Sequence, residues 1–341
     1  MWYTQFGESG DVVLSSRVRL ARNLADLPFG SQMSGQQREE MIDRCRKALP
    51  EMKFIDLGNM TGEEKHALAE CHLISPDMAE SKEKTALLTN EDCSVCIMLG
   101  EEDHIRIQAM APGLSLDKCL EAADRTDDEL EKTVDYGFDE RFGYLTCCPT
   151  NVGTGMRASA MLHLPALTAA GKIDGIIRSL SKLGLAVRGI YGEGSRAEGN
   201  IYQISNQVTL GVSERETVEK LKQVIDEVVQ QERETSRGMY AADKLHLEDR
   251  LMRAFGTLTN ARLLTSGETM NLISDVRWGI NLGIIKNINL ERLSELLYDT
   301  LPANMIKKYN LKNPTERDIK RAELCRSCLA AAVGESAERN E

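Results

Sequence analysis

The stretch that most constrains this chain covers residues 144–161 and reads YLTCCPTNVGTGMRASAM. A short β-favouring run ends at Pro149, which has no N–H to donate to a neighbouring strand. A turn of small residues, NVGTG, follows, and the spacing of residues 156–167 then predicts a helix. A glycine-bearing turn before a helix presents free backbone N–H groups. Such a turn suits an anion, with Cys148 before it and Arg157 just inside the expected helix.

Other interpretations of this turn exist. The spacing Gly153-x-Gly155-x-x-Ala158 also fits the dinucleotide fingerprint, with Asp174 near the place of a ribose-binding acid. Asp174 does not end a second strand, however, and no βαβ unit surrounds the turn. The sequence G-x-x-x-x-G-K-[ST] occurs nowhere, which excludes a P-loop. The pattern alone fits a turn that binds phosphate and a turn that only connects a strand to a helix equally well. Arginines elsewhere in the sequence decide between these two interpretations.

Length and charge limit the possible partners. At ~100–200 residues per domain, 341 residues predict two domains. The formal charge of −11 argues against nucleic acid as a partner, although it can attract a basic protein. No apolar run approaches ~18 residues, and the start MWYTQFGESGDVV lacks a basic and an apolar signal region. We therefore expect a soluble, cytoplasmic protein with no membrane partner.

The nine cysteines do not indicate a disulfide framework in a chain without a signal peptide. Cys93-x-x-Cys96 and Cys325-x-x-Cys328 have the spacing of a four-cysteine zinc site. The first pair lies on an expected strand, where positions three apart point to opposite faces, and the second lies on an expected helix. We interpret them as buried thiols and expect no directly bound metal.

Local signals predict a mixed α+β catalytic domain over residues 1–235 and an all-helical domain over residues 236–341. Capping residues at Ser34, Thr61 and Ser213 mark helix starts. Two β-type runs flank the turn at residues 100–103, which predicts a hairpin. The helices expected in the first domain cover residues 34–49, 61–74, 115–134, 172–183 and 213–235.

Arginines on expected strands or beside turns favour the phosphate interpretation. Arg17 and Arg19 lie two apart in an extended segment and so share one face, as a clamp for phosphate oxygens requires. For this segment alone, a solvated basic edge is the favoured interpretation. If five such arginines converge, they form a triphosphate site that needs no P-loop lysine, with magnesium bridging the phosphates. The five are Arg17, Arg19, Arg106, Arg157 and Arg188.

Acids close to these arginines need a different role, because carboxylates repel a nucleotide. Glu102 lies in the hairpin turn GEED, and Glu193 lies in the glycine-rich loop GEGSRAEG. A solvated acidic loop is the plain alternative for the first. Two carboxylates can instead hold a cationic acceptor.

Four segments, read in order across residues 12–235, resemble the guanidino kinases, the family of creatine and arginine kinases. They are SSRVRLARN, NEDCSVCIMLGEEDHIRIQAM, CPTNVGTGMRA and RGIYGEGSRAEGNIYQISN. The resemblance implies an antiparallel sheet flanked by helices and the use of ATP with Mg²⁺ carried by the nucleotide. The nucleotide-binding residues that it implies are Ser15, Ser16, Arg17, Val18, Arg19, His72, Arg106, Arg157, Ala158, Ser159, Ala160, Met161, Arg188, Gly189, Ile190, Tyr191, Gly192 and Glu193.

The same resemblance implies that Glu102 and Glu193 grip the acceptor guanidinium and that Cys148 lies against it. A guanidinium is a poor nucleophile, since its pKa lies above ~12. A pair of carboxylates can aim one nitrogen at the γ-phosphorus and accept its proton. We expect Glu102 to be the base, Glu193 to orient the acceptor, and a thiolate at Cys148 to add electrostatic support.

Small-molecule guanidino kinases resemble one another in a helical domain before the first arginine clamp, whereas this clamp begins at Ser15 and helices follow it. That arrangement resembles the bacterial protein-arginine kinases. It implies protein substrates marked for an AAA+ unfoldase–protease, control of a stress-gene repressor, a zinc-finger activator protein, and a homodimer formed by the helical domain. It also implies a regulatory phosphoarginine site at Arg317, Asp318, Arg321 and Ala322, although spacing alone indicates only an exposed ion-pair face.

Three alternatives remain to be weighed. A kinase for free arginine or another small guanidino compound is the nearest. A catalytically inactive adaptor would have no need of all five arginines and both glutamates. A nicotinamide enzyme is favoured only by the glycine spacing.

Overall fold

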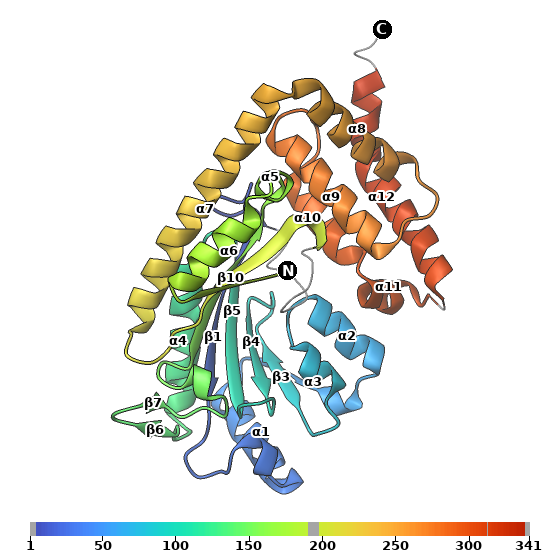
Figure 1. The fold of residues 1–341 in the computed structure, drawn as a ribbon. Coiled ribbons are helices and arrows are strands. Elements are labelled where there is room, and N and C mark those ends of the chain that lie inside the picture. The colour runs from blue at the N-terminus through green and yellow to red at the C-terminus, as the bar shows by residue number, and fades with distance from the viewer. Residues whose placement is uncertain (1–4, 190–197, 312, 338–341) are drawn as a thin grey trace.

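The structure is a computed structural model that describes residues 5–189, 198–311 and 313–337. Within these residues the centre of the molecule is an eight-stranded sheet whose strand pairs are all antiparallel (Figure 1). The strands follow the order β2 (Lys53–Asp56), β3 (Ala86–Thr89), β4 (Val95–Leu99), β5 (Ile105–Pro112), β1 (Val13–Arg22), β8 (Met156–His163), β10 (Ile201–Asn206) and β9 (Leu185–Gly189). The expected antiparallel α+β fold is confirmed.

The central strand β1 separates two different faces of the sheet. Val18 and Leu20 are fully buried, whereas Arg17 and Arg19 alternate with them and are half-buried. This period of two is what a strand requires, and it confirms the extended segment expected from the sequence. One face is therefore the apolar core, and the other is an arginine face.

In the part of the chain that the structure describes, four longer helices cover the core face. Serine caps at Ser34 and Ser213 start two of them as expected, each in a capping box. The last of the four continues to Ala242, so the predicted division after residue 235 falls within a helix and stays a prediction. The helices are α1 (Gly35–Ala48), α4 (Leu116–Glu131), α6 (Ile173–Lys182) and α7 (Glu214–Ala242).

Two short helices, α2 (Gly62–Glu70) and α3 (Pro76–Glu80), pack on the opposite face near β3 and β4. Thr61 and Glu64 form the expected capping box. The helix ends four residues earlier than predicted, however, because His72 has a left-handed φ of 59°. His72 therefore lies beyond the helix and is carried by the connecting loop.

The helix predicted over residues 156–167 is wrong. This segment forms the strand β8, which pairs with β1 on one side and β10 on the other, followed by the short helix α5 (Pro165–Ala169). Met156, Ala158 and Ala160 face the core and alternate with Arg157 and Ser159, which lie on the arginine side of the sheet, so the true period is two. The turn before it therefore does not offer a helix N-terminus to an anion.

Further short elements are η2 (Gly30–Gln32), η3 (Leu57–Asn59), β6 (Phe138–Asp139), β7 (Gly143–Tyr144), η4 (Pro149–Asn151) and η5 (Glu198–Asn200).

The C-terminal part is helical, as expected, with its own apolar core. Its elements are α8 (Lys244–Asn260), α9 (Ser266–Asn281), α10 (Leu290–Asp299), α11 (Pro302–Tyr309) and α12 (Pro314–Ala337). Figure 1 shows α11 beside α2, so the two parts of the chain meet on the arginine face. In the part of the chain that the structure describes, no helix has the length and apolar character needed to cross a membrane.

Candidate active site

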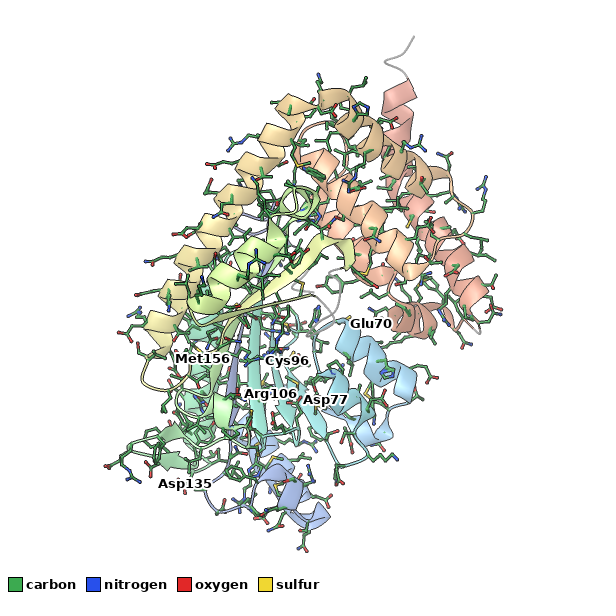
Figure 2. The ribbon with its side chains drawn as sticks, viewed as in Figure 1. Glu70, Asp77, Cys96, Arg106, Asp135 and Met156 are labelled. Atoms are coloured by element: carbon green, nitrogen blue, oxygen red, sulfur yellow. The ribbon has the colours of Figure 1, made fainter. Side chains whose placement is uncertain are left out.

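All five predicted arginines lie on one side of the sheet. Arg17 and Arg19 come from β1, Arg106 from β5, Arg157 from β8 and Arg188 from β9. The register places Arg19 directly opposite Arg157. Figure 2 shows Arg106 among the central strands, on the side that faces α2. Sequence positions more than 170 residues apart are therefore brought to one surface.

Few carboxylates of the described residues form ion pairs with these arginines. Burial lowers the pKa of Arg17 to about 10, and the neighbouring Arg106 adds to this effect. The pKa of Arg19 is also lowered well below its ordinary value, first by burial and then by the neighbouring charges of Arg17 and Arg106. Among the described residues, no carboxylate forms an ion pair with Arg17, Arg19 or Arg157, although Arg17 Nη2 donates to Gln203 Oε1 at 2.9 Å. Like charges directly opposite each other destabilise a sheet, so this surface is built for an anionic ligand.

A cleft of about 590 Å³ opens over this face and is lined by Arg17, Arg19, Arg188 and His72. Ligand pockets in proteins are typically ~300–1,000 Å³, so the cleft has the size that a nucleotide needs. Burial lowers the pKa of His72 to about 3, with contributions from Arg17 and Arg19, so its imidazole is neutral. Gln108 Nε2 donates to the His72 carbonyl oxygen at 2.6 Å, which holds this loop on the sheet.

The other predicted nucleotide-binding residues divide into three groups. Gly189 lines the cleft, and Ser15, Ser159 and Met161 line a small recess of about 10 Å³ beside Arg17 and His72. The side chains of four others point into the core instead, because they alternate with the arginines along β1 and β8: Ser16, Val18, Ala158 and Ala160. Ser16 Oγ, for example, donates to the Gly113 carbonyl oxygen at 2.8 Å. Ile190, Tyr191, Gly192 and Glu193 lie outside the described residues.

The three acids of the hairpin turn have three different environments. Glu101 is buried and pairs with Arg106 Nη1. Asp103 is fully buried. The Glu102 side chain is 50% exposed and lies 3.6 Å from Arg106 Nη2. Of the three, Glu102 alone can meet an acceptor that arrives from solvent.

Asp103 holds this turn in place, a role that sequence analysis missed. Asn23 Nδ2 and the Cys147 backbone N–H both donate to Asp103 Oδ1, each at 2.7 Å. Asn23 Oδ1 in turn accepts from the His104 backbone N–H at 2.9 Å. The loop that carries Glu102 is thereby joined to the loop that carries Cys148. No sequence signal separates Asp103 from its two acidic neighbours, because burial is decided by tertiary packing.

Cys148 lies at the start of η4, with its Sγ 3.0 Å from Thr150 Oγ1. Burial, Arg188 and Arg106 lower the pKa of Arg157, and Cys148 and Glu102 act in the opposite direction. Cys148 and Glu102 thus lie within electrostatic reach of the same guanidinium. The structure brings together the predicted base, the predicted thiol and the arginine face.

The predicted regulatory residues lie far from this turn, on α12. Arg321 and Asp318 form an ion pair at 2.6 Å, but Arg321 is only 1% exposed, which corrects the exposed face expected from spacing. Its Nε donates to the Thr300 carbonyl oxygen at 2.9 Å and its Nη1 to that of Leu264 at 2.8 Å. Ala322 is fully buried in the helical core, whereas Asp318 and Arg317 are half-buried.

Each Cys-x-x-Cys pair contains one buried thiol, Cys96 in the first pair and Cys325 in the second. Burial raises the pKa of both Cys96 and Cys325 to about 12. Within the described ranges, there is no group of three or more histidine, cysteine, aspartate or glutamate side chains that could hold a metal ion.

A cleft of nucleotide size with a cationic wall, next to one half-exposed glutamate, defines a class of protein: an enzyme that transfers a phosphoryl group from a nucleotide to a basic acceptor. The sequence matches the family described as ATP:guanido phosphotransferase, C-terminal catalytic domain, over residues 34–235. It also matches the protein-arginine kinase McsB C-terminal domain over residues 244–340.

Individual relatives agree with these family matches. The chain is 48% identical to the protein-arginine kinase of Caldanaerobacter subterraneus subsp. tengcongensis, with 92% of this chain and 95% of the relative covered. It is 44% identical to the protein-arginine kinase of Bacillus subtilis, with 100% and 96% covered. Among solved structures, a lombricine kinase superposes with a TM-score of 0.60 at 27% identity, covering 69% of this chain and 70% of that one. The chain belongs to the protein-arginine kinases, within the ATP:guanido phosphotransferase family.

Proposed function

We propose that this enzyme transfers the γ-phosphoryl group of ATP to arginine side chains of proteins. The observation that carries the proposal is the arginine face beside Glu102: one part suits a triphosphate, and the other suits a guanidinium. The two relatives match over 95% and 96% of their length and are named protein-arginine kinases, which favours a tethered acceptor over free arginine.

In the proposed reaction, the five arginines hold the phosphate oxygens and spread the charge of the loose transition state. Glu102 accepts a proton from one guanidino nitrogen as that nitrogen forms its bond to the γ-phosphorus. The bond from the γ-phosphorus to the bridging oxygen breaks, and ADP leaves with that electron pair. Glu193 is proposed to orient the acceptor, and Cys148 to stabilise its positive charge. Mg²⁺ carried by the nucleotide is proposed to neutralise its phosphates.

The wider biological role is also a proposal. We infer from the family that phosphorylated proteins go to an AAA+ unfoldase–protease in the cytoplasm, that a stress-gene repressor is one target, and that a zinc-finger protein activates the enzyme. The helical domain is proposed to form the homodimer. A regulatory phosphoarginine would be recognised at the motif of Arg317, Asp318, Arg321 and Ala322, where the half-buried Asp318 is the side chain suited to pair with its guanidinium.

An assay with two acceptors tests the substrate class. With ATP, Mg²⁺ and either casein or free arginine, we expect phosphoarginine in casein, mapped by mass spectrometry under conditions that avoid acid. Product formed on free arginine at a comparable rate, with no modified protein, would favour the small-molecule alternative. Binding of ATP with neither product would favour the adaptor.

The base assignment also predicts a pH dependence. Burial, then the neighbouring Asp103, raises the pKa of Glu102 above its ordinary value of 4.5. The ionised carboxylate is the active form, so activity is present above the raised pKa and is lost as the pH falls through it. We expect kcat, followed as ADP release, to begin falling above pH 4.5 while circular dichroism still reports a folded enzyme. An acid limb that coincides with unfolding would contradict this assignment.

A further inference from the structure

One wall of the nucleotide cleft comes from the helical domain. Opposite the arginines, the cleft is lined by the connection between α10 and α11, hereafter the α10–α11 corner: Leu297, Tyr298, Leu301, Pro302 and Ala303. These side chains are apolar or aromatic, whereas the sheet side carries Arg17, Arg19 and Arg188. A cleft that is cationic at one wall and apolar at the other matches a ligand with phosphates at one end and a flat base at the other.

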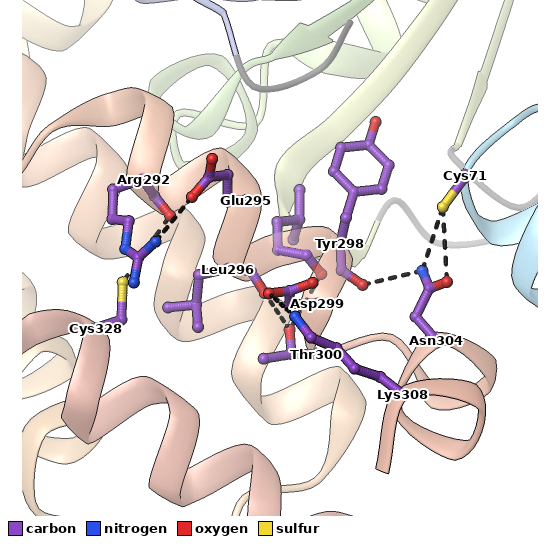
Figure 3. Close-up of polar contacts among 11 residues, drawn as sticks. Cys71, Arg292, Glu295, Leu296, Tyr298, Asp299, Thr300, Asn304, Lys308 and Cys328 are labelled. Carbon is purple, nitrogen blue, oxygen red and sulfur yellow. Dashed lines mark hydrogen bonds and ion pairs between the residues drawn. The ribbon is translucent and has the colours of Figure 1, made fainter. Parts of the chain in front are cut away.

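The α10–α11 corner is fastened to the catalytic part by Glu70, at the end of α2. The two carboxylate oxygens of Glu70 accept from the backbone N–H groups of Ala303 and Asn304, each at 2.8 Å. Cys71 Sγ lies 3.6 Å from Asn304 Oδ1, a contact that Figure 3 shows beside Tyr298. Figure 2 shows Glu70 at the border between α2 and α11. A carboxylate at the first turn of a helix is well placed for its dipole, so this is a specific junction rather than a loose contact.

Tyr298 extends from the α10–α11 corner towards the arginine face. Its ring meets the His72 ring edge-on, with centroids 6.1 Å apart and an interplanar angle of 90°. It packs in one apolar cluster with Met161 of β8 and Ile201 of β10. It also acts on Arg17, because Tyr298 raises the pKa of Arg17 against the larger effects of burial and Arg106. A helical-domain side chain thus adjoins both the phosphate-binding wall and the neutral histidine.

The α10–α11 corner is also supported from behind. The Thr300 carbonyl oxygen, which lies between Tyr298 and Leu301 in the chain, accepts from Arg321 Nε at 2.9 Å. Thr300 Oγ1 donates to the Leu296 carbonyl oxygen at 2.8 Å, as Figure 3 shows. The wall is therefore a rigid part of the helical domain, held through α12.

We propose that the α10–α11 corner receives the base and ribose of ATP, with Tyr298 as a specificity-determining contact, so that the helical domain completes the nucleotide site. This rests on the proposed function, because it assigns the arginines to the phosphates. Nucleotide binding then stabilises the junction of Glu70 with α11, and weakening of that junction lowers affinity for ATP.

The test measures separately what the triphosphate and what the base with its ribose contribute to binding. For the full chain, calorimetry measures the binding of Mg²⁺-ATP and of inorganic triphosphate, which has neither base nor ribose. An aromatic contact to a base contributes ~1–3 kcal/mol, so Tyr298→Ala is expected to weaken ATP about 10-fold. Binding of inorganic triphosphate should be unchanged. The control Tyr309→Ala removes a tyrosine that stacks under Lys320 outside the cleft, and both affinities should be retained.

Two further measurements keep the proposal testable if Tyr298→Ala fails to fold. Tyr298→Leu preserves apolar volume and should still lose affinity for ATP alone. In the wild-type protein, ATP should slow hydrogen exchange at residues 297–306 and inorganic triphosphate should not. ATP binding that ignores Tyr298, with no protection of that segment, overturns this inference but leaves the arginine kinase proposal standing. A wild-type protein that binds no ATP overturns both.

Discussion

Replacement of Glu102 by glutamine is expected to lower kcat by about 10²–10⁴-fold while the affinity for ATP changes little. The amide keeps the size and the polarity of the side chain but cannot accept the guanidino proton. Glu102 is the member of the acidic turn that is 50% exposed beside Arg106, whereas Glu101 is occupied by an ion pair and Asp103 by backbone and amide donors.

The experiment compares single-turnover phosphorylation of casein with calorimetric binding of Mg²⁺-ATP. Glu91→Gln is a matched control, because Glu91 is an exposed glutamate in the turn before β4, at the opposite end of that strand from the turn that carries Glu102. It should retain both quantities. A parallel loss of transfer and ATP affinity in Glu102→Gln would show that Glu102 organises the nucleotide site instead of serving as the base.

Arg321→Ala is expected to reduce the free energy of unfolding of the helical domain by about 3–5 kcal/mol. The substitution leaves the buried Thr300 and Leu264 carbonyl oxygens without the donor that the structure gives them, and it removes the partner of Asp318. Each buried acceptor left unpaired costs ~1–3 kcal/mol, and the volume of the lost side chain adds to this.

Chemical denaturation followed by circular dichroism measures this loss. Glu323→Ala changes the same helix at a side chain that is 52% exposed and pairs with the surface residue Lys320, so a loss below ~1 kcal/mol is expected. If Arg321→Ala unfolds as the wild type does, the two hydrogen bonds from Arg321 to Thr300 and Leu264 do not hold α12 to the rest of the domain. The result also matters for regulation, since a loss of phosphoarginine response in Arg321→Ala is informative only when stability has been measured beside it.

Local chemistry made several elements predictable. Ser34, Thr61 and Ser213 each combine a hydroxyl with a glutamine or glutamate three residues later, and each starts a helix. The polar turn at residues 100–103 forms the expected hairpin between β4 and β5. The helix predicted over residues 156–167 was wrong, because the apolar residues of this segment fit both the helical and the strand period. The pairing of β8 with β1 and β10 selects the strand.

The order of residues along the chain fixes which chemical groups are available: arginines at alternating positions, acids at turns, and motifs that resemble those of guanidino kinases. It could do so because caps, turns and side-chain alternation depend on residues close together in the chain. How those groups are arranged follows from the folding of the whole chain. It placed Arg19 opposite Arg157, left Glu102 exposed beside two buried acids, buried Arg321, and lined the cleft over the arginine face with Ala303 held by Glu70. These outcomes depend on burial and on contacts between residues up to 233 positions apart, which no local pattern specifies.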